Sequence, residues 1–202
     1  MCTICSARAL SECLQIGFSD LMTRKSAAAI RLLVLDVDGT MTDGKLYFGP
    51  RGEALKVFHV RDGQGIKHLD AAGIQVAVIS GRKSRMTAIR CRELGVEHII
   101  QGAQDKVAAF EKLRTRLKIA AAQSACVGDD AADVPLMKVV KVAFAVADAH
   151  RDALRAAHIV TSLPGGQGAV REVCDYLLQM TSRGRSTGIG TGLGAAHEKK
   201  PR

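Results

Sequence analysis

The chain has 202 residues, of which 47% are hydrophobic and 3% aromatic, and its formal net charge is +9. A chain of this length and composition can bury one good-sized core, so we expect a single domain. No segment has the long uncharged apolar run of a membrane span, and the first residues lack the basic start and apolar stretch of a secretory signal. We therefore expect a cytoplasmic protein with no membrane partner.

The positive charge is concentrated near the end of the chain. Residues 181–202 carry five Lys or Arg against one Glu, and residues 1–28 carry three against two, so the middle of the chain holds only +4. The aromatic content is too low for platforms on which single-stranded bases stack. We expect no nucleic-acid partner.

The first strong signal follows an N-terminal extension, residues 1–28, to which we assign no role. The apolar run 32–35 is typical of a fully buried parallel strand, and Asp36 and Asp38 follow it directly. Carboxylates at the end of a buried strand need a partner, and a hard divalent cation is the strongest one available. We interpret Asp36 and Asp38 as a nucleophile and its acid/base partner; the alternative is a turn built on Asp-x-Asp-Gly.

Residues 45–60 interrupt the pattern of buried strands. Two short extended runs flank Gly49-Pro50-Arg51-Gly52, which predicts a β-hairpin that projects past the first site motif. A helix-like run over 63–72 follows it.

A second strand-like run, 76–79, ends in Ser80, Gly81 and Arg82. A hydroxyl and a backbone N–H at a strand end can hold a phosphoryl oxygen. By itself, Ser-Gly-Arg is also common in ordinary loops.

A helix-like run (84–94) and a strand-like run (98–100) lead to Lys106, at the start of an amphipathic run over 107–117. A cation at a helix N-terminus is mildly unfavourable because the helix dipole is positive there. The placement is better explained if an anion is bound; the alternative is a solvated lysine.

The strand-like run 125–127 leads to three acids, Asp129, Asp130 and Asp133. Like charges this close repel one another unless a cation neutralises them. The pattern favours a metal site over its alternative, an acidic helix N-terminus.

The remaining runs keep the alternation. Strand-like runs cover 142–145 and 158–160, and helix-like runs cover 134–140, 151–156 and 168–178. The whole pattern predicts an α/β fold, a Rossmann-like parallel sheet with helices on both faces, over residues 29–180. Residues 181–202 are rich in Gly, Ser and Thr, and we predict a disordered tail.

The four motifs together resemble those of the haloacid dehalogenase superfamily of aspartate-nucleophile phosphohydrolases. Within it, the chain resembles the 3-deoxy-D-manno-octulosonate 8-phosphate (KDO 8-phosphate) phosphatases over roughly 30–178. The segments that carry this closer resemblance are 36–44, 60–67, 101–102 with Lys106, 146–149 and 165–172. It implies a Mg²⁺-dependent phosphatase of lipopolysaccharide precursor synthesis. The gaps between the motifs have no room for a cap domain, so we expect a capless enzyme whose site is closed by oligomerisation; the resemblance implies a homotetramer.

The resemblance also assigns roles to the motif residues. Asp36 is the nucleophile, and Asp38 protonates the leaving alcohol and then activates water. Ser80 and Lys106 hold the phosphoryl oxygens, and Asp133 orients Lys106 or the metal waters. The Mg²⁺ ligands are the Asp36 carboxylate, the Asp38 backbone carbonyl and the Asp129 carboxylate, an oxygen-only set that suits this ion.

Substrate binding is expected to rest on the motif residues and on basic side chains that suit a sugar carboxylate. The expected set is Asp38, His59, Val60, Arg61, Asp62, Gly63, Lys67, Arg82, Arg90 and Lys106. The chain departs from the family pattern at His59, where Asn is usual, and at Ser80, where Thr is common. His59 leaves open another sugar-acid phosphate, such as a nonulosonate 9-phosphate, and a non-catalytic oligomerisation domain is the alternative from a different class.

Overall fold

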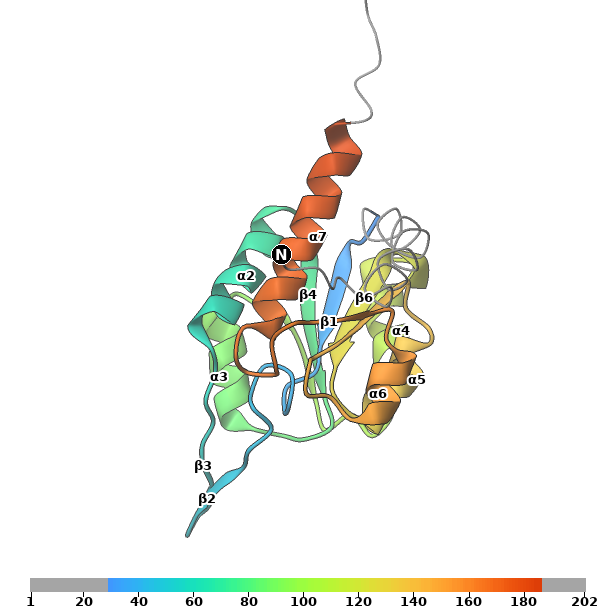
Figure 1. The fold of residues 1–202 in the computed structure, drawn as a ribbon. Coiled ribbons are helices and arrows are strands. Elements are labelled where there is room, and N and C mark those ends of the chain that lie inside the picture. The colour runs from blue at the N-terminus through green and yellow to red at the C-terminus, as the bar shows by residue number, and fades with distance from the viewer. Residues whose placement is uncertain (1–28, 187–202) are drawn as a thin grey trace, which may run out of the picture.

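The computed structural model describes residues 29–186 and is built on a six-stranded sheet in the order β5-β4-β1-β6-β7-β8 (Figure 1). All neighbouring strands pair in parallel, which confirms the predicted sheet. The strands are β1 (Leu32–Leu35), β4 (Gln75–Ser80), β5 (His98–Gln101), β6 (Ser124–Gly128), β7 (Val142–Ala145) and β8 (Ile159–Val160).

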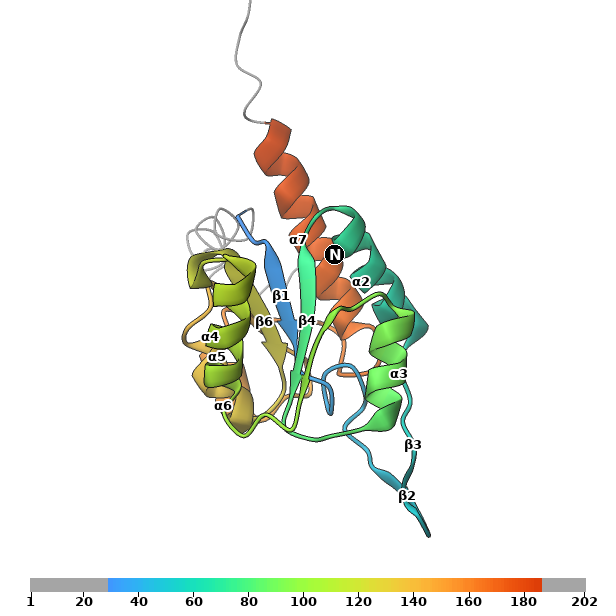
Figure 2. The same cartoon turned by 180° about the vertical axis from the view of Figure 1, so that it is seen from behind.

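Helices cover both faces of this sheet, as predicted (Figures 1 and 2). One face carries α2 (Val60–Ala71), α3 (Arg85–Glu93) and α7 (Ala169–Ser186). The other carries α4 (Lys106–Leu117), α5 (Val134–Met137) and α6 (Arg151–Ala156), with the short 3-10 turns η1 (Ala121–Gln123) and η2 (Ala131–Asp133) near them. Helices α2 and α7 pack against each other, and the C-terminal part of α7 extends beyond α2.

Strand β1 runs through the middle of the core. Each of its four side chains is at most 1% exposed, because helices cover the sheet on both sides. Burial on both faces explains why the sequence here is an unbroken apolar run with no alternation. Each buried leucine contributes about 1.5–3 kcal/mol to the stability of the fold.

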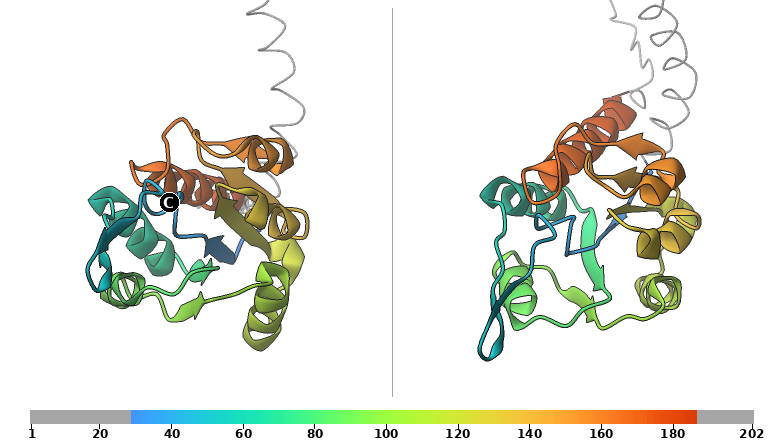
Figure 3. Two further views of the ribbon diagram at one scale, coloured as in Figure 1. Left: turned by 90° about the horizontal axis from the view of Figure 1, so that it is seen from below. Right: turned by 60° about the horizontal axis from the view of Figure 1, so that its bottom comes forward.

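The order of the strands creates a crevice between β1 and β6. The chain leaves β1 toward β4 on one side, whereas it leaves β6 toward β7 on the other side. Ligands in open α/β sheets bind at such a switch point, at the carboxyl ends of the strands. Asp36 directly follows β1 and Asp129 directly follows β6, so both acids lie at this edge, which faces the viewer in the left view of Figure 3.

The predicted hairpin is present and extends beyond the carboxyl ends of the strands (Figure 1). It consists of β2 (Tyr47–Gly49) and β3 (Gly52–Leu55), which pair antiparallel in a separate sheet. Within residues 29–186 the gap after β1 holds this hairpin and α2, and the gap after β4 holds α3 and β5, so neither holds a cap domain.

Two helices are longer than the sequence pattern indicated. Helix α2 begins at Val60 and not at Gly63, so His59 takes the N-cap position. Helix α7 continues to Ser186, beyond the boundary expected at residue 180. The N-terminal extension and the rest of the tail lie outside the described residues. Among the helices of residues 29–186, none combines the length and apolar character needed to cross a membrane.

Candidate active site

A buried ion-pair triad lies at the carboxyl edge of the sheet. Lys106 is the first residue of α4, and its Nζ donates hydrogen bonds of 2.6 Å to Asp36 Oδ1 and of 2.6 Å to Asp133 Oδ1. Asp36 and Lys106 are each 8% exposed. The two carboxylates offset the unfavourable position of a cation at a helix N-terminus and raise the pKa of Lys106, although burial alone would lower it. Lys106 is therefore a fixed positive charge beside Asp36.

Three carboxylates crowd together around this lysine. One oxygen from each of Asp36, Asp129 and Asp133 can be chosen so that all lie within 4.8 Å of one another. Burial, and then repulsion from Asp133, raises the pKa of Asp36 to about 6. Burial, followed by repulsion from Asp36 and Asp133, raises the pKa of Asp129 to about 8. One lysine does not balance three acids, so the cluster favours a further cation.

The loops around the cluster are built to hold these oxygens. Asp133 Oδ2 accepts backbone N–H groups from Asp129 at 3.1 Å and from Asp130 at 3.3 Å, and Thr40 Oγ1 donates to Asp129 Oδ1 at 3.2 Å. At Gly39, where φ is +94°, a Cβ would lie 2.0 Å from Asp129 Oδ2, so only glycine lets the two loops meet. A set of oxygen donors alone fits a hard divalent ion such as Mg²⁺.

The surroundings of Asp38 differ from those of the acidic cluster formed by Asp36, Asp129 and Asp133. Its Oδ1 accepts a hydrogen bond from Lys56 Nζ, and Arg82 Nη1 lies 4.0 Å from the same oxygen. Glu53 Oε1 lies 3.5 Å from Lys56 Nζ and 3.4 Å from Arg82 Nη2. The sequence analysis missed Lys56 and Glu53, because a lysine or glutamate on a hairpin is ordinarily solvated and nothing in the pattern marks it.

Comparison with known proteins shows which family the chain resembles. Residues 95–171 match the family model described as haloacid dehalogenase-like hydrolase. The 3-deoxy-D-manno-octulosonate 8-phosphate phosphatase KdsC of Escherichia coli is 47% identical over 169 residues, which is 84% of this chain and 89% of that protein. The chain belongs to the family of KDO 8-phosphate phosphatases.

Solved structures of this family share the fold. The phosphatase from Moraxella catarrhalis, crystallised with a magnesium ion, a phosphate ion and a KDO molecule, is 34% identical, with a TM-score of 0.77 over 82% of this chain and 97% of that chain. The cobalt-bound form of the Haemophilus influenzae phosphatase is 42% identical, with a TM-score of 0.76 over 82% of this chain and 96% of that chain.

The other expected phosphate-binding residue lies at the same edge. Ser80 ends β4, the neighbour of β1, and is 3% exposed. Its Oγ accepts the backbone N–H of Arg82 at 3.3 Å. The structure thus brings Asp36, Ser80, Lys106 and Asp129 to one edge of the sheet, as the motifs of a KDO 8-phosphate phosphatase predict.

Two expected substrate contacts, Asp62 and Gly63, have structural roles, and their contact with substrate stays a prediction. Asp62 is only 2% exposed, and its Oδ1 accepts the backbone N–H of Arg171 at 2.8 Å. Burial, the largest influence, raises the pKa of Asp62 above its ordinary value, against the opposing effect of that N–H. Gly63 is buried, and a Cβ there would lie 2.5 Å from Arg90 Nη2. Asp62 and Gly63 therefore belong to the packing of α2 against its neighbours.

The remaining expected substrate residues are spread over α2 and α3. Val60 is 75% exposed, and Lys67 and Arg61 are also exposed. Arg90 Nη1 pairs with Glu93 at 3.0 Å. His59 is half-buried at the N-cap of α2, and within the described residues its Nδ1 has no hydrogen-bond partner.

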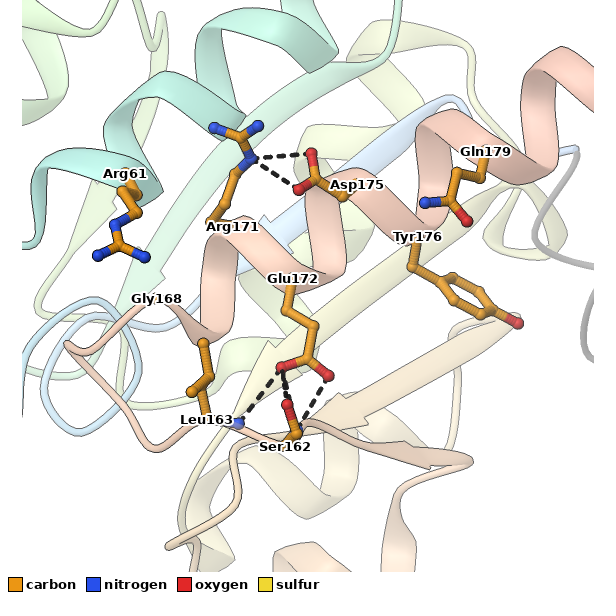
Figure 4. A pocket seen from close by; sticks show the side chains of 9 residues that line it. All are labelled: Arg61, Ser162, Leu163, Gly168, Arg171, Glu172, Asp175, Tyr176 and Gln179. Atoms are coloured by element: carbon orange, nitrogen blue, oxygen red, sulfur yellow. Dashed lines mark hydrogen bonds and ion pairs between the residues drawn. The ribbon is translucent and has the colours of Figure 1, made fainter.

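Arg61 lines a cavity of about 400 Å³ that is separate from the acidic cluster (Figure 4). None of the acids of the cluster is among the lining residues, which are Arg61, Ser162, Leu163, Gly168, Arg171, Glu172, Asp175, Tyr176 and Gln179. In Figure 4 the side chains of Arg171 and Asp175 pair along α7, and Glu172 bonds to Ser162.

Proposed function

We propose that this protein is a Mg²⁺-dependent phosphatase that hydrolyses KDO 8-phosphate to KDO and phosphate, in lipopolysaccharide precursor synthesis. The observation that carries the proposal is the Asp36–Lys106–Asp133 triad beside Asp129 at the switch point, in a chain 47% identical to a named KDO 8-phosphate phosphatase. The Moraxella catarrhalis structure with magnesium, phosphate and KDO supports the choice of metal and substrate.

Asp36 is the proposed nucleophile. One of its oxygens forms a bond to phosphorus as the bond from phosphorus to the sugar oxygen breaks, which gives an aspartyl-phosphate. Lys106 holds the Asp36 carboxylate in place and, with Ser80, binds the phosphoryl oxygens, over which charge is spread in the transition state. Asp36 and Asp129, with the backbone carbonyl of Asp38, would hold Mg²⁺, which when bound offsets the repulsion between the phosphate and the carboxylates.

Asp38 is the proposed acid and base. It gives a proton to the departing sugar oxygen in the first step. In the second step it takes a proton from water, whose oxygen bonds to phosphorus while the bond from Asp36 to phosphorus breaks. Asp133 is fully engaged by Lys106 and two backbone N–H groups, so we assign it to positioning Lys106.

Recognition of the sugar carboxylate is assigned first to Arg82. Its side chain is 37% exposed near Asp38, and within the described residues Nη1 makes no hydrogen bond. A guanidinium group suits bidentate binding of a carboxylate. The other expected substrate contacts stay predictions: His59, Val60, Arg61, Asp62, Gly63, Lys67 and Arg90.

We further propose that the enzyme is a homotetramer assembled through the hairpin. Large apolar side chains are exposed on and next to it: Leu46, Tyr47, Phe48, Leu55, Val57 and Val60. A capless site must still be shielded from water during phosphoryl transfer, and a neighbouring copy can supply that cover. The cytoplasmic location stays a prediction.

His59 favours a second candidate, the same chemistry on another sugar-acid phosphate such as a nonulosonate 9-phosphate. A non-catalytic oligomerisation domain is disfavoured, since Asp36, Asp38, Lys106 and Asp129 are all present.

Phosphate release from a panel of sugar phosphates, with and without Mg²⁺, tests the proposal. We expect Mg²⁺-dependent preference for KDO 8-phosphate in the wild type and loss of that activity in Asp36→Asn, with a cooperative thermal unfolding transition as the folding control. Preference for another sugar-acid phosphate would favour the second candidate. No hydrolysis by folded wild type would favour the non-catalytic domain.

A further inference from the structure

A buried polar network joins the base of the hairpin to Asp38. Lys56 directly follows β3, yet its side chain is only 3% exposed, and its Nζ donates to Asp38 Oδ1. Glu53, whose side chain is 15% exposed, also pairs with the ammonium group, with Oε1 at 3.5 Å from Nζ. A buried ammonium is stable only when carboxylates meet it, so these two acids fix the place of Nζ.

Glu53 is itself anchored to the sheet edge. Its Oε2 accepts the hydroxyl of Ser84, the N-cap of α3, and its Oε1 accepts a hydrogen bond from Arg82 Nη2. Ser84 N in turn donates to Gln101 Oε1 at 2.6 Å, at the end of β5. Through Glu53, Lys56 is thus connected to the start of α3 and to the loop after β4, and its position does not depend on the hairpin backbone alone.

We propose that Lys56, braced by Glu53, is a positioning residue that fixes the carboxyl group of Asp38 for proton transfer to the leaving oxygen. Lys56 engages Oδ1, while within residues 29–186 Oδ2 makes no hydrogen bond and is free to carry the reacting proton. The inference rests on the proposed role of Asp38 and adds to it the part of the chain that orients the acid. It also makes the orientation of the Asp38 carboxyl group depend on the position of the hairpin relative to the sheet.

The choice of substrate distinguishes this role from a general contribution to stability. A carboxyl group that rotates away from its productive orientation loses rate through geometry, even when the rest of the site is intact. The loss is confined to substrates whose leaving group needs a proton. The alcohol that leaves an alkyl phosphate such as KDO 8-phosphate needs a proton. The leaving group of p-nitrophenyl phosphate needs none, because it departs as a stable phenolate.

The test compares kcat/KM for these two substrates in Lys56→Met, which keeps the apolar stem and removes the charge. We expect kcat/KM for KDO 8-phosphate to fall by about 10- to 100-fold, part of what a general acid contributes. For p-nitrophenyl phosphate we expect a change within about threefold, because that transition state does not need the proton. Asp38→Ala is the reference and should show the same selectivity between substrates with a larger loss.

Three further variants complete the set. Lys45→Met removes another hairpin lysine, 71% exposed and paired with Asp43, and should leave both substrates unaffected. Lys56→Arg should restore part of the KDO 8-phosphate activity. Glu53→Gln keeps Lys56 but removes the carboxylate that holds it. This variant should give a smaller loss of kcat/KM with the same substrate selectivity. It replaces Lys56→Met in the test if that variant does not fold.

The outcomes separate the inference from the function on which it rests. Equal loss on both substrates, no loss on either, or a rise in KM alone in these variants would overturn the role of Lys56 while wild type stays active. Wild type inactive on KDO 8-phosphate would overturn the proposed function and, with it, the inference. Asp38→Ala without substrate selectivity would overturn the proposed role of Asp38 as acid, and with it the inference, while an active wild type keeps the proposed function.

Discussion

At the residue scale, the acidic cluster couples metal binding to protons. Burial and mutual repulsion raise the pKa of Asp36 to about 6 and that of Asp129 to about 8 in the protein without metal. Both groups must lose their protons to act as ligands, so Mg²⁺ binding releases protons and strengthens as the pH rises. We expect the affinity for Mg²⁺, measured by titration calorimetry, to rise steadily between about pH 6 and about pH 8.

The same shifts set the stability of the metal-free protein. A raised pKa means that the folded state binds protons more tightly than the unfolded state, so the free energy of unfolding falls as the pH rises through this range. Added Mg²⁺ should then raise the melting temperature more at about pH 8 than at about pH 6. An affinity that does not change with pH, with no proton release in buffers of different ionisation enthalpy, would contradict this coupling.

Gly39 allows a prediction with a matched control. In Gly39→Ala, the new Cβ would meet the Asp129 carboxylate at 2.0 Å and push this ligand out of place. We expect Mg²⁺ affinity and phosphatase activity to fall by about tenfold or more, as when other groups that orient metal ligands are altered. Gly52→Ala is the control, because φ there is +99° but no atom lies within 4 Å of the new Cβ. If both variants bind Mg²⁺ like wild type, the contact between the two loops is not needed for the site.

At the element scale, Asp62 joins α2 to the start of α7. Its carboxylate accepts the N–H of Arg171, one of the first-turn N–H groups that have no partner within α7 itself. We expect Asp62→Ala to lower the free energy of unfolding by about 1–2 kcal/mol, as for the loss of a helix N-cap. Denaturant titration measures this difference.

The pH dependence of this variant has a definite sign. Because burial raises the pKa of Asp62, its ionised form is disfavoured in the folded state, and the destabilisation caused by Asp62→Ala should shrink as the pH rises through that pKa. Asp175→Ala is the control, since it removes only a surface ion pair with Arg171 on the same helix, worth about 0.3–0.5 kcal/mol. Equal effects of the two substitutions would mean that Asp62 does not act as a cap.

These contacts mark where prediction from the sequence stops. Asp36, Lys106 and Asp129 were predictable because each directly follows a buried strand or begins a helix, and parallel strands bring their carboxyl ends to one edge. The contact of Asp62 with α7 spans 109 positions, and that of Lys56 with Asp38 depends on how the hairpin folds back. Hydrophobic periodicity reports which face of an element is buried, and it carries no information on which distant side chain meets it.

At the scale of the whole molecule, the hairpin exposes large apolar side chains, whereas the solvent-facing surface of a monomeric protein is expected to be polar there. Phe48 in β2 is 66% exposed and Leu55 in β3 is 52% exposed, and these two strands extend beyond the body of the fold (Figure 1). Several large exposed apolar side chains on one short segment are typical of protein–protein interfaces. A copy that covers the hairpin would also lie near Asp38, since Lys56 at the hairpin base contacts it.

Charged substitutions on the hairpin should therefore separate assembly from folding. We expect the double variant Phe48→Glu with Leu55→Glu to elute as a monomer in size-exclusion chromatography with light scattering, because burial of two charges in an interface costs several kcal/mol. Its melting transition should remain cooperative, since neither side chain belongs to the core, while kcat/KM for KDO 8-phosphate falls as the site loses its cover. Val139→Glu, at an apolar side chain 38% exposed beyond α5, is the matched control and should keep the wild-type oligomer. A double variant that stays tetrameric would place the interface elsewhere, and a fully active monomer would show that the site needs no neighbouring copy.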